Sequence, residues 1–330
     1  NNAVTGSTNE AVFGCVQDTM IGIYLMTHEH MMMPAEGLMD ITMLQRYARR
    51  ELSEIMPPCA PDTLVPSRWA IDLLFPRDFH YEQGGVKIVD GRIQPGSGPF
   101  NKRHAGTGSS SINFLMALDY SNETSLEWLS DVGRTAFLFL TQYYGFSISL
   151  SDMTIDPQTL ARAQTQILAA CDEAGKQREE KAQLEVLSEA MQVASDAVDQ
   201  SDFARPLNSL RVLVESGAKG SRLNAQQLIV SVGQQIIGTG RPPLDGNGRT
   251  LSCYPPHAAA RDAEARGFIP ESYVTGLRPK GHFVHAEAAR KGLTDTVRFV
   301  LFRCPAVVCM WLRRASFFLV STAAAAAAAA

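Results

Sequence analysis

Residues 216–240 read SGAKGSRLNAQQLIVSVGQQIIGTG, and the rest of the chain can be ordered around this stretch. Two serines and two glycines within residues 216–221 allow a tight backbone turn, and Lys219 adds a single cation to it. A helix is predicted from Leu223 to Ile237, so the turn lies at a helix N-terminus, which attracts anions such as phosphates. The same residues are also compatible with a glycine cap that simply separates two helices.

Upstream of the turn, the sequence changes character near residue 156. In residues 1–155, the patterns predict short strands and helices, with helices over Ala11–Thr27, Met39–Ile55 and Leu126–Tyr144 and a hairpin over Val86–Ile93. From Asp156 the chain is rich in Ala, Gln, Glu and Leu, and Pro157 is typical of a first helical turn. We expect two long helices that form an antiparallel hairpin turning near Gly175.

Downstream of the turn, residues 241–278 are loop-rich because prolines and glycines recur there. A long helix is predicted from Pro279 to at least Thr296, which corresponds to about 27 Å of helix. Residues 323–330 are all alanine, and we expect this run to stand for unassigned residues.

Composition limits the classes of function. The 330 residues are 45% hydrophobic and 19% charged, which suffices for two or three small cores. The net charge of −4 and the isoelectric point of about 6.0 argue against a free-standing DNA-binding domain, because such domains are usually basic. They are compatible with a part of a larger nucleic-acid machine whose basic channel is built elsewhere.

The cysteines and apolar runs give two further expectations. The six cysteines are Cys15, Cys59, Cys171, Cys253, Cys304 and Cys309. None forms Cys-x-x-Cys, so we expect no structural zinc site and reduced thiols. The apolar run from Cys304 to Leu312 is too short to cross a bilayer, so no membrane partner is expected.

Several short motifs occur in an order that is typical of one family. In and after the turn they are Ser216-Gly217-Ala218-Lys219-Gly220-Ser221, Asn224, Gln227 and Val232-Gly233-Gln234-Gln235. On either side they are Val16-Gln17-Asp18-Thr19, Ile88-Val89-Asp90-Gly91, Gly145-Phe146-Ser147, Glu264-Ala265-Arg266-Gly267-Phe268, Gly276-Leu277-Arg278-Pro279, His285-Ala286 and Asp295-Thr296. Over about residues 11–296 this series resembles the largest subunit of multisubunit DNA-directed RNA polymerases, the eukaryotic and viral type more than the bacterial type.

The resemblance implies a fold of the α+β class, with a small mixed pore domain, a mainly helical funnel hairpin and a long bridge helix. It assigns residues 1–155 to the pore domain, 156–240 to the funnel helices, 241–278 to a connector, and 279–322 to the start of the bridge helix and a divergent tail. The family pattern stops after Thr296, where we expect a shifted reading frame or a truncated gene product.

The resemblance also implies a reaction, which is template-directed RNA synthesis. The family holds two Mg²⁺ ions with an Asn-Ala-Asp-Phe-Asp-Gly-Asp loop, and this sequence does not contain that loop. We therefore expect no catalytic residue and no metal site in this chain. Mg²⁺ would be held by a polymerase segment outside it, and the chain alone would be inactive.

Candidate binding residues follow from the same resemblance. Lys219 would point toward the triphosphate of an incoming nucleotide, and a mobile ammonium suits phosphate. The residues that would form or support the bridge helix are Gln227, Gln234, Gln235, Arg241, His285, Arg290, Asp295 and Thr296. The chain departs from the family at Lys291, where relatives carry glutamate, and over Glu287–Ala289, where they carry glycines.

The implied partners are the second-largest subunit, the remaining polymerase subunits, template DNA, RNA and nucleoside triphosphates, with a cleavage factor in the funnel. The implied location is the nucleus, or the cytoplasm or virion for a viral enzyme.

Two other classes of function stay open at the level of sequence. On a strand, His28-Glu29-His30 would put both imidazoles on one face, as in metal-dependent hydrolases, which predicts further ligands at later strand ends. A helical scaffold or interaction protein centred on residues 157–238 would explain the helices but not the ordered motifs around them.

Overall fold

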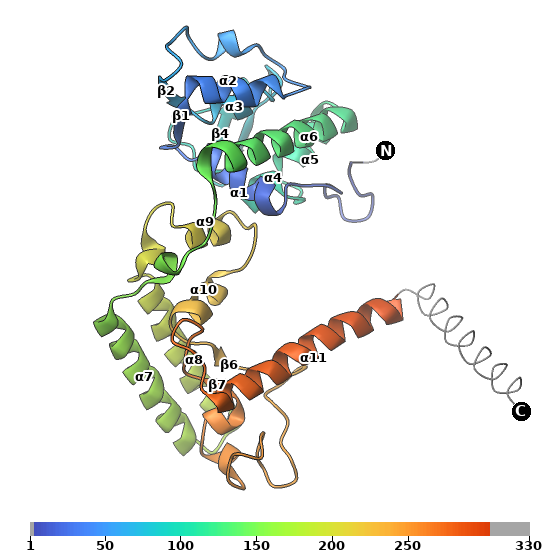
Figure 1. The fold of residues 1–330 in the computed structure, drawn as a ribbon. Helices are drawn as coiled ribbons and strands as arrows, with labels where there is room; N and C mark the ends of the chain where they lie inside the picture. The colour runs from blue at the N-terminus through green and yellow to red at the C-terminus, as the bar shows by residue number, and fades with distance from the viewer. Residues whose placement is uncertain (1–2, 304–330) are drawn as a thin grey trace, which may run out of the picture. The chain divides into compact units, whose positions relative to one another are not determined.

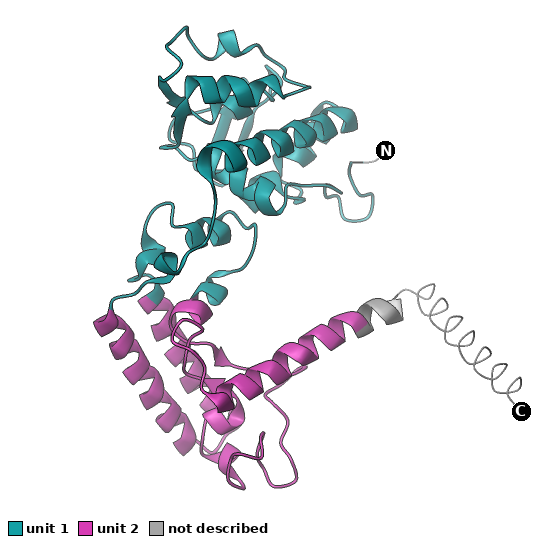
Figure 2. Cartoon of the chain, viewed as in Figure 1, with its two compact units in different colours: residues 1–156, 198–225 teal, residues 157–197, 226–330 magenta. Residues whose placement is uncertain are grey.

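The computed structural model describes the backbone of residues 3–303 and the side chains of residues 3–297. The predicted tail beyond residue 303, with Cys304, Cys309 and the alanine run, lies outside the described residues. The chain divides into two compact units, coloured separately in Figure 2. Unit 1 comprises Asn1–Asp156 and Val198–Ala225, and unit 2 comprises Pro157–Ala197 and Gln226–Ala330.

Unit 1 combines short helices with two small antiparallel sheets (Figure 1). Its α-helices are α1 (Gln17–Met26), α2 (Ala35–Met43), α3 (Trp69–Asp72), α4 (Lys102–Ala105), α5 (Ile112–Asp119), α6 (Asn122–Leu138) and α9 (Ser209–Glu215). One sheet pairs β1 (Met32–Pro34) with β2 (Leu64–Pro66), and the other has the order β3 (Tyr81–Gln83), β4 (Val86–Val89), β5 (Arg92–Ile93). A π-helical segment, Phe139–Tyr144, follows α6, and 3₁₀ turns occupy Leu52–Glu54, Leu150–Met153 and Asp202–Ala204.

An aromatic cluster fills the core of unit 1. Phe75 stacks on Phe79 with ring centroids 5.4 Å apart, and it also lies 6.0 Å from Trp128 of α6. Helix α1 approaches α6 closely at Gly22, where an added Cβ would meet the Cβ of Ala136 at 2.7 Å. Glycine is therefore needed at this crossing to let the two helices pack.

The predicted hairpin over Val86–Ile93 is confirmed. Ile88 of β4 lies opposite Ile93 of β5, and both side chains are buried. The two turn residues, Asp90 and Gly91, have φ values of 51° and 65°. Positive φ at both central positions is the geometry that matches the twist of a two-residue hairpin, and Asp-Gly is a preferred pair for it.

The helix predicted over Met39–Ile55 is wrong beyond its first turns, because α2 begins earlier and ends at Met43. The residues after it form tertiary rather than helical hydrogen bonds. The Gln45 amide donates to the carbonyl of Ala70 at 2.7 Å, and the backbone N–H of Tyr47 donates to Asp131 at 2.6 Å. These bonds hold the chain in an irregular path against α3 and α6.

Unit 2 contains a helical hairpin, a small sheet and a long C-terminal helix. Its elements are α7 (Pro157–Lys176), α8 (Glu180–Val198), the second half of α10 (Arg222–Ile229), β6 (Gly233–Gln234), β7 (Phe268–Ile269) and α11 (Pro279–Arg303). Strands β6 and β7 pair antiparallel, and 3₁₀ turns occupy Ala258–Ala260 and Glu264–Arg266. The α+β class with a helical hairpin and a long final helix agrees with the prediction.

Buried apolar side chains line the helical hairpin. Those of α7 are Ala163, Ile167, Cys171 and Ala174, and those of α8 are Leu187, Ala190, Ala194 and Ala197. Their spacing of three and four residues places each set on one face of its helix. A turn over residues 177–179 joins the helices, close to the predicted position at Gly175.

The helix predicted over Leu223–Ile237 is also shorter in the structure, because α10 ends at Ile229. Beyond it, the chain binds the segment around β7: the hydroxyl of Ser231 donates to the carbonyl of Ile269, and the N–H of Val232 donates to that of Glu271. Gly233 has φ +79°, a conformation that ends any helix.

Candidate functional site

The turn at residues 216–221 connects α9 to α10 within unit 1. Gly217 and Gly220 have φ values of 76° and 73°, so both serve as left-handed turn residues. The backbone N–H of Lys102 donates to the carbonyl of Ser216 at 2.8 Å, and that of Ser221 donates to the Asn224 side chain at 2.8 Å. The turn is thus fixed at both ends by hydrogen bonds.

Lys219 is exposed in this turn. Its backbone N–H donates to the carbonyl of Leu213 at 3.4 Å, and its ammonium has no hydrogen bond or ion pair with any other described residue. The carboxylate of Glu215, just before the turn, accepts from the Tyr24 hydroxyl at 2.8 Å and from Arg211 at 2.7 Å. Because Glu215 is already paired, the charge of Lys219 is available to an anion.

Lys102 is a neighbour of the turn that sequence reasoning missed. A Cβ added to Gly217 would meet the Cβ of Lys102 at 2.7 Å and its Cδ at 3.4 Å, so the lysine stem runs directly along the turn. Lys102 is exposed and lies at the start of α4, far from Lys219 in the sequence. The turn therefore has a second exposed lysine beside it.

The other predicted residues belong to unit 2. His285 of α11 lies between two polar groups: its Nδ1 is 3.0 Å from Oε1 of Gln235, and its Nε2 is 3.0 Å from the Tyr273 hydroxyl. Burial, with a smaller contribution from His282, lowers the pKa of His285. The neutral imidazole therefore connects α11 to the segment after β6.

Two further glutamines hold backbone segments together. The Gln234 amide donates to the carbonyls of Gln235 at 3.0 Å and Arg266 at 3.1 Å. The Gln227 amide donates to the carbonyl of Val232 at 3.4 Å. Both side chains therefore act inside unit 2.

Arg241 is a buried cation with an incomplete set of partners. Its Nη1 donates to Oε1 of Gln183 on α8 at 2.9 Å, while its Nε and Nη2 have no partner among the described residues. Burial, with repulsion from Arg266, lowers the pKa of Arg241 to about 10. The side chain joins the helical hairpin to the loop-rich connector.

The remaining candidates lie farther along α11. Asp295 pairs with Lys291 at 2.8 Å, and the hydroxyl of Thr296 donates to the carbonyl of Gly292 at 2.9 Å. Arg290 is exposed and has no polar partner among the described residues. The structure therefore does not join these three residues to Gln235 or Arg241 through side-chain contacts.

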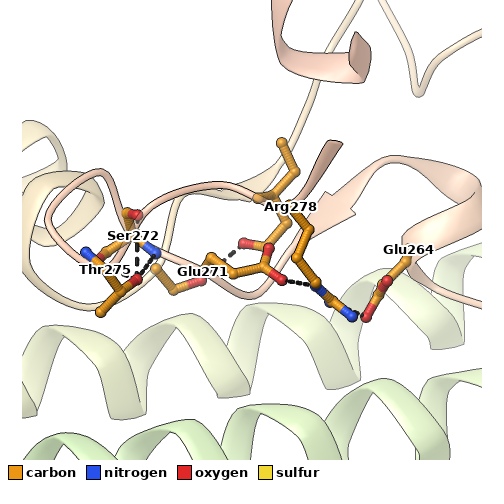
Figure 3. A network of polar contacts seen from close by, with 7 residues as sticks. Glu264, Glu271, Ser272, Thr275 and Arg278 are labelled. Carbon is orange, nitrogen blue, oxygen red and sulfur yellow. Dashed lines mark hydrogen bonds and ion pairs between the residues drawn. The ribbon is translucent and has the colours of Figure 1, made fainter. Parts of the chain in front are cut away.

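A polar network surrounds the base of α11 (Figure 3). Arg278 directly precedes the helix and pairs with Glu264, at 2.6 Å, and with Glu271. Ser272 and Thr275 close the turn between them: each backbone N–H donates to the hydroxyl of the other, at 3.0 and 3.1 Å.

The strand predicted for His28 and His30 under the hydrolase alternative is wrong. Both residues lie in a turn directly after α1, with ring centroids 5.9 Å apart. A turn does not provide the strand face that this alternative needs. Within residues 3–303 there is no group of three His, Cys, Asp or Glu residues that could hold a metal ion. Among the described helices, none combines the length and the apolar character that a membrane span requires.

Comparison with known proteins places this chain in a family context. The model of RNA polymerase Rpb1, domain 3, matches residues 2–153, and that of RNA polymerase Rpb1, domain 4, matches residues 159–269. DNA-directed RNA polymerase subunit Rpo1N of Halobacterium salinarum is 27% identical over 315 residues, covering 87% of this chain and 31% of the relative. DNA-directed RNA polymerase II subunit RPB1-B of Trypanosoma brucei brucei is 25% identical over 325 residues, covering 89% of this chain and 18% of the relative. The chain thus spans less than a third of the length of these relatives.

Proposed function

Because the chain belongs to the family of RNA polymerase largest subunits, of which it carries domains 3 and 4, we propose that it works as part of a DNA-directed RNA polymerase. The reaction of the assembly is template-directed nucleotidyl transfer. The role of this chain is to shape the pore through which nucleotides reach the active centre and to support the bridge helix. In this proposal residues 1–155 form the pore domain, 156–240 the funnel and 279 onward the bridge helix.

The observation that carries the proposal is the exposed, unpaired ammonium of Lys219 on a turn fixed by hydrogen bonds. Phosphate is a ligand that a free ammonium close to a helix N-terminus attracts. Lys102, whose stem lies along Gly217, adds a second positive charge nearby. We infer that this pair of lysines meets the triphosphate of a nucleotide on its way to the active centre.

A second part of the proposal concerns α11. The base of α11 is the part of unit 2 from which the helix starts. It contains hydrogen bonds made by the side chains of Gln227, Gln234, Gln235 and Arg241, and His285 connects the helix to it. Arg290, Asp295 and Thr296 lie beyond the base and are available to other parts of a complex. This arrangement supports a bridge helix that is anchored at one end and exposed along the rest.

The polymerase reaction uses Mg²⁺, which polarises the reacting phosphate and activates the attacking hydroxyl. The described residues do not supply a fitting set of ligands, so no step in this chain is assigned to the metal. We propose that the other polymerase subunits, template DNA, RNA and nucleotides are its partners. The nucleus, or the cytoplasm, is the proposed location.

Lys219→Ala in the assembled polymerase tests this function. We expect the apparent KM for nucleotides to rise about fivefold with little change in kcat, which corresponds to about 1 kcal/mol of lost binding. Lys219→Arg should retain most of the affinity because it keeps the charge. Lys181→Ala is the matched control, since Lys181 is an exposed lysine of α8 whose nearest carboxylate, on Glu185, is 3.9 Å away.

An unchanged KM in Lys219→Ala, measured by single-nucleotide incorporation, would remove Lys219 from the nucleotide path. An equal rise in KM for Lys181→Ala would mean that the effect reflects overall charge rather than this turn.

A further inference from the structure

Arg278 occupies a position where a cation is ordinarily unfavourable. The N–H of His282 donates to its carbonyl at 2.9 Å, so Arg278 is the residue that caps the start of α11. Helix N-termini carry a partial positive charge, and Ser, Thr, Asp or Asn are the usual caps. The guanidinium of Arg278 is held there by the carboxylates of Glu264 and Glu271 (Figure 3). Because two carboxylates surround one guanidinium, the net charge of this group beside the helix N-terminus is negative, and a negative charge stabilises that end of a helix.

The two carboxylates come from different segments of unit 2. Glu264 opens the 3₁₀ turn Glu264–Arg266, and its backbone N–H donates to the Asp262 carboxylate at 2.9 Å. Glu271 follows β7, and its carbonyl accepts the N–H of Val232 beyond α10 at 2.8 Å. Through these two carboxylates, Arg278 links the first turn of α11 to both the connector and the β6–β7 sheet.

Only the beginning of α11 is packed in this way. Gly281 lies against Ile269, and a Cβ added to Gly281 would meet the Cγ2 of Ile269 at 3.2 Å. Val284 is 1% exposed. From residue 286 to residue 297, the side-chain hydrogen bonds and ion pairs among described residues stay within the helix itself. The direction of the whole helix is therefore determined by contacts over its first two turns.

We propose that Arg278 is a positioning residue, and that its ion pairs with Glu264 and Glu271 set the direction in which α11 leaves unit 2. A change of about 5° at the base displaces a point about 27 Å along the axis by about 2 Å. Such a displacement is large for a helix that contacts reacting groups, because an error of about 1 Å in placement is enough to slow chemistry strongly. The inference rests on the proposed function of α11 as a bridge helix.

Arg278→Met and Arg278→Lys in the assembled polymerase test this inference. Methionine keeps much of the aliphatic stem and removes the charge, whereas lysine keeps the charge. For Arg278→Met we expect kcat of nucleotide addition to fall about fivefold with KM within twofold of wild type. Amide hydrogen exchange over residues 280–286 should become about tenfold faster. Arg278→Lys should stay within twofold of wild type in both measurements, and Lys181→Ala, which removes an exposed ion pair of α8, should match wild type.

Three results of the polymerase assay would overturn the inference. They are wild-type kcat in Arg278→Met, a rise in its KM in place of the fall in kcat, or equal impairment in Arg278→Lys and Arg278→Met. Hydrogen exchange is read on the protein itself, so unchanged exchange in Arg278→Met also overturns it even if the polymerase assignment holds. Failure of the proposed function is seen differently, as an assembly with the wild-type chain that makes no RNA, and it would remove the reaction that Arg278 is proposed to serve.

Discussion

Individual residues explain why the Lys219 turn was predictable and why its surroundings were not. Glycines at 217 and 220 in a short polar stretch indicate left-handed turn positions directly from sequence, and both have positive φ in the structure. The contact with Lys102 was not predictable in this way. It depends on the folded path that brings the start of α4 next to Gly217, and local spacing contains no information about that path.

Gly217→Ala should destabilise unit 1 and displace the turn. An alanine at φ +76° costs about 1–2 kcal/mol, and its Cβ would also meet that of Lys102 at 2.7 Å. The urea midpoint of the protein should therefore fall. Gly108→Ala is the matched control, because no atom lies within 4 Å of its added Cβ and its φ is not positive. Equal midpoints for the two variants would contradict the close approach.

Asp72 gives unit 1 a pH-dependent stability. Its side chain accepts the N–H of Ile93 at 2.9 Å and is 3% exposed, and burial raises its pKa from 3.8 to about 7 despite nearby arginines. Since the folded pKa lies above the unfolded value, the contribution to stability is fully present below about pH 4. It is lost as pH rises toward 7, where the unfolded chain ionises first.

Asp72→Asn should remove this loss because an amide keeps the acceptor oxygen and does not ionise. We expect the variant to be more stable than wild type at pH 8, by about 1–3 kcal/mol, and close to it at pH 4. Urea unfolding at the two pH values measures this difference. Asp62→Asn, which changes an exposed carboxyl in the loop before β2, should retain the wild-type pH dependence. If the stability of Asp72→Asn changes with pH as steeply as that of the wild type, other groups cause the pH dependence.

At the scale of elements, the long periodic helices were predicted well. Two other predicted helices end earlier in the structure, because tertiary contacts replace their last turns. The hairpin of α7 and α8 follows from composition, spacing and Pro157. By contrast, the predicted ends of α2 and α10 were wrong because Gln45 and Ser231 bind distant backbone carbonyls in place of the next helical turn. Helical propensity along a sequence does not include these competing partners.

The contact between α8 and the connector provides a test at this scale. Arg241 is buried, and Gln183 is its one hydrogen-bond partner among the described residues, so Arg241→Met should leave stability unchanged or raise it, because the cost of burying the charge disappears. Gln183→Leu should instead cost about 1–3 kcal/mol, because it leaves the buried guanidinium without that partner. Thermal unfolding of both variants measures the difference.

Arg261→Met is the control for this pair, since Arg261 is exposed in the same unit. If Arg241→Met proves more destabilising than Gln183→Leu, the guanidinium makes stabilising contacts besides its hydrogen bond to Gln183.

At the scale of the whole molecule, the ordered series of motifs identified the family, whereas composition alone only excluded other classes. The proposed complex leads to a prediction about α11. Phe283, Leu293 and Val297 are 61%, 71% and 58% exposed and lie on one side of the helix. A helix with such a face is expected to be covered by a partner.

Replacing Phe283, Leu293 and Val297 together by serine should reduce co-purification of the second-largest polymerase subunit, quantified by mass spectrometry, at least fivefold. The urea midpoint of this triple variant should stay near that of the wild-type chain, because the three side chains are exposed in the chain itself. If recovery of that subunit is unchanged, α11 does not make the proposed contact.

The division of the chain has a consequence for how this protein changes over evolutionary time. The hairpin of α7 and α8 is inserted between two stretches that form unit 1, and its helices are 20 and 19 residues long. Deleting residues from one helix alone would shift its buried face against the other. Homologous chains with longer or shorter hairpins should therefore have gained or lost similar numbers of residues in both helices, in steps of about seven, which is two helical turns.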